Sequence, residues 1–110
     1  MVSYKVILSP HALGQLEDHI SYLLYVKQNK QAARSLWRDA NKTKKRLSGI
    51  ASSLKYCDHP SLKAAGYRII HFKSHRYVML YHIDEGTVFV EAIYHEKQNY
   101  ESLFSKSIHS

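Results

Sequence analysis

Residues 66–101 constrain the fold of this chain more than any other segment. From Gly66 to Glu101, runs of β-branched, aromatic and aliphatic residues alternate with short polar stretches, which predicts strands at 67–72, 76–83 and 87–94. The polar stretches 73–75 (Lys-Ser-His) and 84–86 (Asp-Glu-Gly) supply the turns. Strands joined by turns this short pair antiparallel with their neighbours, so the segment predicts a mostly antiparallel sheet.

A strand and two helices precede this sheet. Residues 3–8 alternate and predict a strand, and Ser9-Pro10 is a good helix start with Ser9 as the N-cap. Apolar residues at helical spacing carry the first helix to about Lys27. After a polar connector at 27–30, a second helix carries one apolar face, formed by Ala33, Leu36, Trp37, Ala40, Leu47, Ile50, Ala51 and Leu54. The short connector implies that the two helices are antiparallel neighbours.

The remaining segments complete one domain, residues 1–110. Residues 55–66 read as a loop punctuated by Pro60 and Gly66, and the polar tail from Glu96 has room for a short C-terminal helix. The order is therefore β-α-α-β-β-β. The economical arrangement is an α+β fold in which two antiparallel helices pack on one face of a small, mostly antiparallel sheet.

The balance of charge favours an anionic partner. Sixteen Lys and Arg residues stand against nine Asp and Glu residues, a formal net charge of +7 with neutral histidines. Nine of the basic residues lie between Lys27 and Lys55, where the one acid is Asp39. Nucleic acid, a ribosome or an acidic protein segment would suit such a surface, although solubility alone would also explain it. The candidates for nucleic-acid binding on the second helix are Arg34, Arg38, Lys42 and Lys45.

Other features exclude several classes of protein. The single cysteine, Cys57, cannot form an internal disulfide, which suits a reducing cytoplasm, and we expect it to fill the core as a small apolar residue. No apolar run approaches the roughly 18 residues of a membrane span, and the N-terminus does not resemble a signal peptide. We therefore expect a cytoplasmic protein that needs no membrane, no metal and no other cofactor.

The strand ends carry the residues best suited to chemistry. Chemistry at a phosphate group needs a base, an acid and cations that stabilise the crowded phosphate. His95, which ends the last strand, is the best acid–base candidate because imidazole titrates near neutral pH. Arg68 and Arg76 could clamp phosphate oxygens, and Tyr100 could stack on a base or donate a proton. Further positive charge at the rim could come from Lys73, His75 and Lys97.

Each of these residue types also has a structural explanation. The two arginines could pair with acidic neighbours, and the tyrosines on the strands suit core or cross-strand positions. We expect His71 and His82 on the exposed face of the sheet or in ordinary hydrogen bonds. The surface is the expected place for His11, His19, His59 and His109.

The order of elements and the strand motifs resemble the RelE/ParE superfamily of bacterial type II toxin–antitoxin toxins. Four motifs carry the resemblance, in order: Gly66-Tyr67-Arg68 at the opening of a strand, the strand His75–Ile83, the Asp-Glu-Gly turn, and Tyr94-His95-Glu96-Lys97-Gln98-Asn99-Tyr100. The resemblance covers nearly the whole chain. It implies one of two activities on the same fold. RelE-like members cleave mRNA in the ribosomal A site, ParE-like members inhibit DNA gyrase, and an antitoxin neutralises both.

The resemblance also bears on single positions. Arg68 matches the first basic residue of a Lys-x-Lys pair in RelE-like members, but Ile70 stands at the second. Arg76 falls near a mid-sheet arginine, and Tyr100 matches a tyrosine close to the C-terminus. His95 matches a histidine that RelE-like and ParE-like members share. Where RelE-like members carry an arginine after the last strand and ParE-like members a Gly-Arg pair, this chain has Glu96-Lys97.

The leading interpretation is a metal-independent, ribosome-dependent mRNA endoribonuclease that inhibits translation. Its expected partners are mRNA on the ribosome and an antitoxin whose acidic amphipathic helix covers the helical pair or the basic concavity. One alternative is a ParE-like toxin that binds and inhibits DNA gyrase, which the residues at positions 70 and 96 favour. A degenerate toxin that retains only antitoxin binding is the other.

Overall fold

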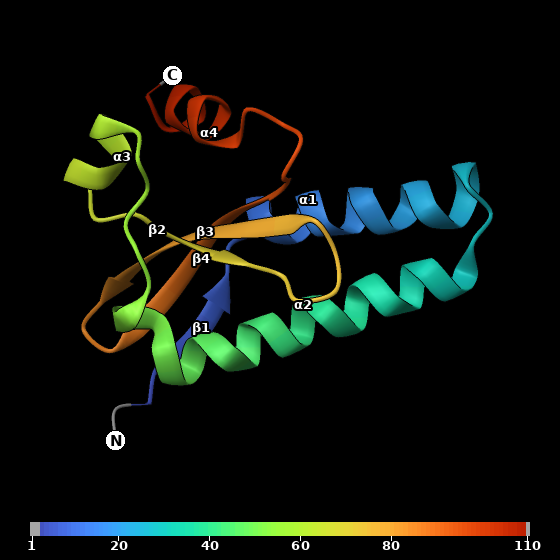
Figure 1. The fold of residues 1–110 in the computed structure, drawn as a ribbon, viewed down its shortest axis with the longest axis horizontal. Coiled ribbons are helices and arrows are strands. Elements are labelled where there is room, and N and C mark those ends of the chain that lie inside the picture. Colours follow the sequence, from blue (N-terminus) through green and yellow to red (C-terminus); the bar gives the residue numbers. More distant parts are fainter. Residues whose placement is uncertain (1–2, 110) are drawn as a thin grey trace.

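The computed structural model describes residues 3–109 and contains a four-stranded sheet with helices on both of its faces (Figure 1). The first half of the chain forms β1 (Lys5–Leu8), α1 (Pro10–Ser21), the π-helical turn η1 (Tyr22–Val26), α2 (Lys30–Ile50) and the 3-10 turn η2 (Ala51–Ser53). The second half forms α3 (Pro60–Ala64), β2 (Arg68–His71), β3 (Tyr77–Asp84), β4 (Thr87–His95) and α4 (Tyr100–Ile108). The predicted α+β fold, the order of its strands and two long helices, and the short C-terminal helix are confirmed.

The sheet is mixed, with strand order β1-β4-β3-β2. The predicted antiparallel pairing holds for β2 with β3 and for β3 with β4. The N-terminal strand β1 instead lies parallel to β4, with Lys5 opposite Thr87. A parallel neighbour needs a long crossover connection, and the two helices after β1 begin that connection. The last strand of the sequence therefore becomes an inner strand of the sheet.

Local caps explain where the long helices begin. The Ser9 hydroxyl accepts a hydrogen bond from the Ala12 backbone N–H at 3.0 Å, and Pro10 occupies the first helical position. The Asn29 side chain likewise accepts from the Ala32 N–H at 3.0 Å. Both helices then run side by side in opposite directions, as the short connector predicted (Figure 1).

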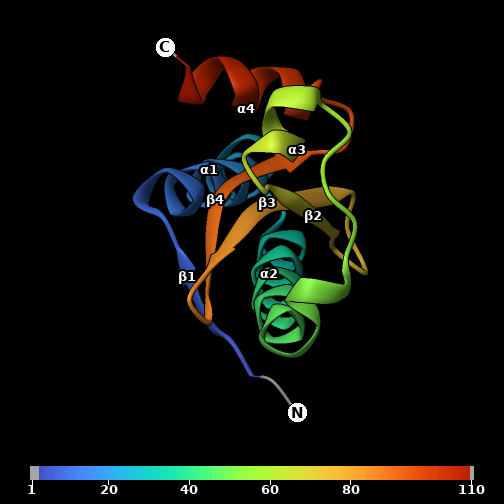
Figure 2. The same ribbon diagram turned by 90° about the vertical axis from the view of Figure 1, so that its left-hand side faces the viewer.

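Helices cover both faces of the sheet, where the sequence predicted a single helical layer. On one face, α1 and α2 pack on a cluster that includes Ile70, Met79, Tyr81 and Val90. On the other face, Leu62 of α3 and Phe104 of α4 pack on a second cluster, formed with Cys57, Ile69, Val78, Leu80, Ala92 and Tyr94. Figure 2 shows α4 and α2 on opposite sides of the sheet. Because both faces are covered, four consecutive residues of β3 are buried, 78–81.

The segment 55–66, expected to be a loop, contains the helix α3. Pro60 starts it, and Leu62 is fully buried beneath it. Gly66, at a φ of 86°, ends it through two bonds typical of a helix end: its own N–H donates to the Lys63 carbonyl, and the Tyr67 N–H donates to the Leu62 carbonyl. A helix of five residues is too short to produce an apolar period, so the pattern missed it.

Within the described residues, no helix combines the length and the apolar character that crossing a membrane requires.

Candidate functional site

Three strand ends meet at one end of the sheet, which we call the His95 end and define by His71, Arg76, Tyr77, His95 and Glu96. Tyr77, the first residue of β3, pairs with His95, the last residue of β4. The Glu96 N–H donates to the Arg76 carbonyl at 2.8 Å. His71 ends β2, and its Nδ1 lies 2.7 Å from a carboxylate oxygen of Glu96. The backbone of Arg76 therefore lies beside the end of β4, next to His95.

The turn after β4 orients the His95 ring. The Lys97 N–H donates to the Nδ1 of His95 at 3.1 Å, so a neutral His95 carries its proton on Nε2. The side chain of Gln98 accepts from the His95 N–H at 2.9 Å. Lys97 itself is exposed. The imidazole is thus held with one nitrogen occupied by the backbone and the other left for a partner.

His19 of α1 joins this end of the sheet. The ring of Tyr77 lies between two imidazoles, with centroid distances of 4.8 Å to His19 and 4.9 Å to His95. Burial, followed by the nearby charge of His95, lowers the pKa of His19. The sequence placed His19 on the surface, but the structure makes it half-buried. Its position directly before the core residue Ile20 was the one available signal.

The single acid of the basic helix, Asp39, turns inward. Its carboxylate is 4% exposed and accepts the Ser74 N–H at 2.9 Å, and the same oxygen lies 2.7 Å from Nδ1 of His75. The guanidinium of Arg46 donates to the His71 carbonyl at 3.3 Å. These contacts fix the turn between β2 and β3 to α2. His75 is therefore a link between layers, while Lys73 in the same turn stays exposed.

Arg68 lies at the opposite end of the same strand pair. Arg68 pairs with Tyr81 of β3. Arg76 directly precedes the first residue of β3, so it lies five residues from Tyr81, or about 16 Å along the strand. The guanidinium donates to the Leu54 carbonyl and, at 2.8 Å, to the Tyr56 hydroxyl, and it stacks over the Tyr56 ring at 3.9 Å. The expected convergence of the two arginines on one phosphate is therefore not found.

Ile70, where RelE-like members carry a second lysine, belongs to the core. Its side chain is 2% exposed and lies in the cluster beneath α1 and α2. A lysine in this packing would bury an unpaired charge, which is strongly unfavourable. The missing cation is thus replaced by a packing residue.

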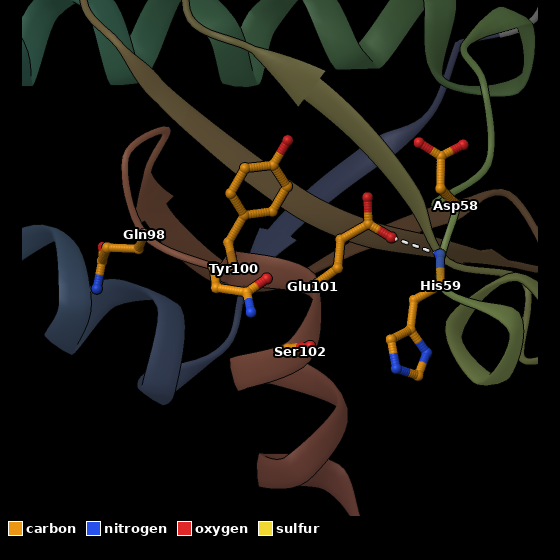
Figure 3. A pocket seen from close by; sticks show the side chains of 7 residues that line it. Asp58, His59, Gln98, Tyr100, Glu101 and Ser102 are labelled. Atoms are coloured by element: carbon orange, nitrogen blue, oxygen red, sulfur yellow. Dashed lines mark hydrogen bonds between the residues drawn. The ribbon is translucent and has the colours of Figure 1, made fainter.

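Tyr100 lines a hollow of about 480 Å³ beside α4 (Figure 3), together with Asp58, His59, Gln98, Asn99, Glu101 and Ser102. The Glu101 carboxylate accepts the His59 N–H at 2.7 Å. Burial and then the charge of Glu101 raise the pKa of Tyr100. Tyr100 packs on the α4 face of the sheet, whereas Tyr77 packs on the α1 face. The carboxylates of Glu101 and Glu96 act on this tyrosine more strongly than the ammonium group of Lys55 does.

A groove with apolar walls lies on the helical face around Trp37, and we call it the Trp37 groove. Trp37 was expected on the buried face of α2, but it is 46% exposed. It separates two hollows of about 360 and 420 Å³. Ile20, Leu24, Ala33, Arg34 and Arg38 line the first, and the second is lined by Val6, Ile7, Leu8, Leu13, Leu16, Ala40, Asn41 and Lys44. The groove has apolar walls and a basic rim.

The tip of the helical hairpin exposes a second apolar surface. Tyr25 is 77% exposed, Val26 65% and Tyr22 49%. They lie in the π-helical turn, where the Lys27 N–H donates to the Tyr22 carbonyl at 3.0 Å. A π-helical turn shifts the side chains that follow it relative to a regular helix, and such turns are frequent at functional sites. Exposed aromatic residues of this kind are typical of protein contact surfaces.

The other predicted nucleic-acid-binding residues, Arg34, Arg38, Lys42 and Lys45, are all exposed on α2. They lie on the helical layer, so they do not form one cluster with the strand-end residues. In the part of the chain that the structure describes, no three His, Cys, Asp or Glu side chains gather closely enough to hold a metal ion.

Comparison with known proteins gives a consistent result. The family model described as "ParE toxin of type II toxin-antitoxin system, parDE" matches residues 6–100. A solved structure titled "Chromosomal ParDE TA system from P. aeruginosa" superposes with a TM-score of 0.67, at 12% identity, over 84% of this chain and 96% of that chain. At this identity the superposition shows a shared fold. Among curated proteins, no sequence matches significantly.

The family model covers nearly the whole span from β1 to the first residue of α4. The fold and its element order agree with it, and the sequence resemblance predicted the same superfamily. This chain therefore belongs to the ParE toxins of type II toxin–antitoxin systems, within the RelE/ParE superfamily.

Proposed function

We propose that this toxin acts by binding and inhibiting DNA gyrase in the cytoplasm, not by cutting mRNA. The observation that carries the proposal is the dispersal of the candidate catalytic groups. Arg68 is held by Leu54 and Tyr56 about 16 Å from Arg76, and Tyr100 packs among acids on the other face. Phosphoryl chemistry needs its cations and acid–base groups around one phosphate, whereas inhibition by binding needs only a complementary surface.

The hairpin tip is the surface that we assign to gyrase. Tyr22, Tyr25 and Val26 are all strongly exposed within one short turn, and contiguous exposed apolar residues mark protein interaction sites. Tyrosine is enriched among residues that dominate binding energy at protein interfaces. The tip also projects away from the sheet, so a large target can reach it (Figure 1).

The Trp37 groove is the surface that we assign to the antitoxin. A half-exposed tryptophan between two apolar hollows suits the apolar face of an amphipathic helix. Arg34, Arg38 and Lys44 along its rim would pair with acidic residues on that helix. Because the antitoxin and gyrase are assigned to separate surfaces, the bound antitoxin would neutralise the toxin either by blocking the approach of gyrase or by changing the conformation of the hairpin.

A supercoiling assay with purified gyrase tests the proposal. The wild-type protein should inhibit supercoiling, and Tyr25→Ala should weaken that inhibition at least tenfold, because this ring is the most exposed aromatic of the tip. Tyr56→Ala is a matched control, since Tyr56 is also exposed but lies far from the tip beside Arg68. Equal losses in both variants, or no inhibition by the wild type, would contradict the proposal.

A second candidate function rests on the His95 end. The ring of Tyr77 joins His95 to His19, so two imidazoles are close together, and the backbone of Arg76 adjoins the residue after His95. This arrangement keeps an endoribonuclease as the rival interpretation. Mapping of mRNA ends on translating ribosomes decides between the two: cuts that disappear in His95→Ala while gyrase is unaffected would replace the gyrase proposal. Expression without any growth arrest would indicate a degenerate toxin that binds only its antitoxin.

A further inference from the structure

The outward face of α2 carries positive charge without any compensating acid. Arg34, Arg38, Lys42 and Lys45 are all exposed, and we call them the α2 stripe. The one acid of the helix, Asp39, is buried against the turn between β2 and β3. Within residues 3–109, no acidic side chain forms an ion pair with any member of the stripe.

The spacing places these four cations in one line. Residues 34, 38 and 42 follow one another at steps of four, and residue 45 comes three later, so all lie on one side of the helix. At a rise of 1.5 Å per residue, the line is about 16 Å long. Among the exposed residues between and beside them, Ser35 and Asn41 are polar and uncharged, Lys44 adds a further cation, and Trp37 lies between Arg34 and Arg38. The stripe is therefore a continuous row of positive charge.

Such a row is a poor solution to solubility alone. Like charges at a spacing of four residues destabilise a helix by a few tenths of a kcal/mol per pair, whereas alternating Glu and Lys at the same spacing would stabilise it and keep the surface equally polar. Here the one acid of the helix, Asp39, is buried and does not alternate with the exposed cations. An anionic partner along the stripe would relieve the repulsion.

We propose that the α2 stripe binds the phosphate backbone of duplex DNA without reading its sequence. Lysine and arginine on phosphates supply most of the affinity of non-specific DNA binding. The exposed side of the 21-residue helix α2 can lie against a duplex. Single strands instead bind in grooves that offer aromatic rings for stacking, and the part of the stripe from Arg38 to Lys45 exposes no aromatic residue.

An acidic protein segment fits the stripe less well than DNA does. Stable protein contacts need apolar or aromatic anchors at their centre. Trp37, which lies with Arg34 and Arg38 at the Trp37 groove, is such an anchor, whereas residues 38–45 expose no apolar or aromatic side chain. The inference goes beyond gyrase inhibition and does not require it, since contact with DNA would place the toxin where any DNA-bound target works.

Fluorescence anisotropy with a labelled duplex of about 20 base pairs and arbitrary sequence tests the inference, using the full-length protein alone. The wild type should bind, and the logarithm of its association constant should fall linearly with the logarithm of salt concentration, with a slope of up to about −3.6 for four phosphate contacts. The double variant Lys42→Glu, Lys45→Glu should weaken binding at low salt at least tenfold. These two lysines do not line either hollow beside Trp37.

The matched control is the double variant Lys63→Glu, Lys106→Glu. It changes the net charge by the same amount, but its lysines are exposed on α3 and α4, on the other side of the sheet. If both double variants lost DNA affinity equally, net charge alone would explain the binding, and the inference would be overturned. Unchanged urea-unfolding midpoints would show that both variants keep the fold.

Competitors identify the class of ligand. An unlabelled duplex should displace the probe, and polyglutamate at the same charge concentration should do so poorly. Stripe-dependent binding of single-stranded RNA that is tighter than binding of the duplex would overturn the inference in favour of an RNA ligand. Equal competition by polyglutamate would overturn it in favour of an acidic protein. The gyrase proposal is tested separately, because the supercoiling assay measures gyrase activity and does not measure binding of the toxin to the labelled duplex.

Discussion

At the scale of single residues, the histidines of this chain lie in different environments. His71 and His82 lie beside carboxylates of Glu96 and Glu91, at 2.7 and 3.5 Å. His71 is exposed, and His82 stacks on Phe89, so both follow the structural explanation given to them from the sequence. His19 and His95 instead flank a tyrosine, and burial and then the charge of His95 lower the pKa of His19.

The titration of His19 offers a test at this scale. Its pKa in the folded protein is lowered below 6.5, so the unfolded chain binds this proton more readily and stability is lost as the pH falls through 6.5 towards the folded pKa. NMR titration should place its midpoint below that of an unstructured histidine peptide. In His95→Gln, the midpoint should rise, because the second cause of the shift is removed.

His109→Gln is the matched control for that experiment, since His109 is exposed at the end of α4. It should leave the His19 midpoint unchanged. A His19 midpoint at or above the peptide value would contradict the packing of this ring against Tyr77.

At the scale of elements, the hairpin between α1 and α2 depends on one strained residue. Gln28 has a φ of 51° and reverses the chain between the π-helical turn and the cap of α2. The left-handed region costs a residue with a Cβ about 1 kcal/mol relative to glycine. The connector therefore holds the exposed tip in place at the expense of local strain.

Gln28→Gly should accordingly raise the free energy of unfolding by about 1 kcal/mol, as measured by urea denaturation. Gln28→Ala removes the same side chain but keeps the Cβ, so it should not reproduce the gain. Equal stabilisation in the two variants would assign the effect to the lost glutamine side chain and not to the backbone.

The elements also show what the sequence could predict. Caps at Ser9 and turn residues at 84–86 are local signals, and they placed the long helices and strands within a few residues. The inward turn of Asp39 and the separation of Arg68 from Arg76 depend on how layers and strands meet. Two arginines that each open a strand lie at opposite ends when the strands are antiparallel. The short turn at 73–75 already predicted that antiparallel pairing, so the separation of the two arginines could have been deduced, whereas the inward turn of Asp39 could not.

At the scale of the whole molecule, the sheet is a middle layer, and the second core beneath α3 and α4 was not predicted. Phe104 is 2% exposed and packs edge-on against Tyr67 at 5.0 Å. The short helix α3 and the C-terminal helix α4 were too brief to reveal an amphipathic face, so the sequence indicated one layer of helices.

Phe104→Ala should therefore lower the free energy of unfolding by about 3–5 kcal/mol, because it empties a closed core position. Its neighbour supplies the control: Leu103 is 43% exposed, and Leu103→Ala should cost less than about 1 kcal/mol. Urea unfolding followed by circular dichroism measures both. Similar, small losses in the two variants would show that α4 only rests on the surface.

The parallel pairing of β1 with β4 has a consequence for how the protein folds during synthesis. Lys5 pairs with Thr87, so β1 has no partner strand in the sheet until β4 has been synthesised. Pairings this distant in sequence are slow to form, since a long loop must close first. The hairpin of β2 and β3 can pair as soon as it is made, but β1 stays unpaired until nearly all of these residues have left the ribosome.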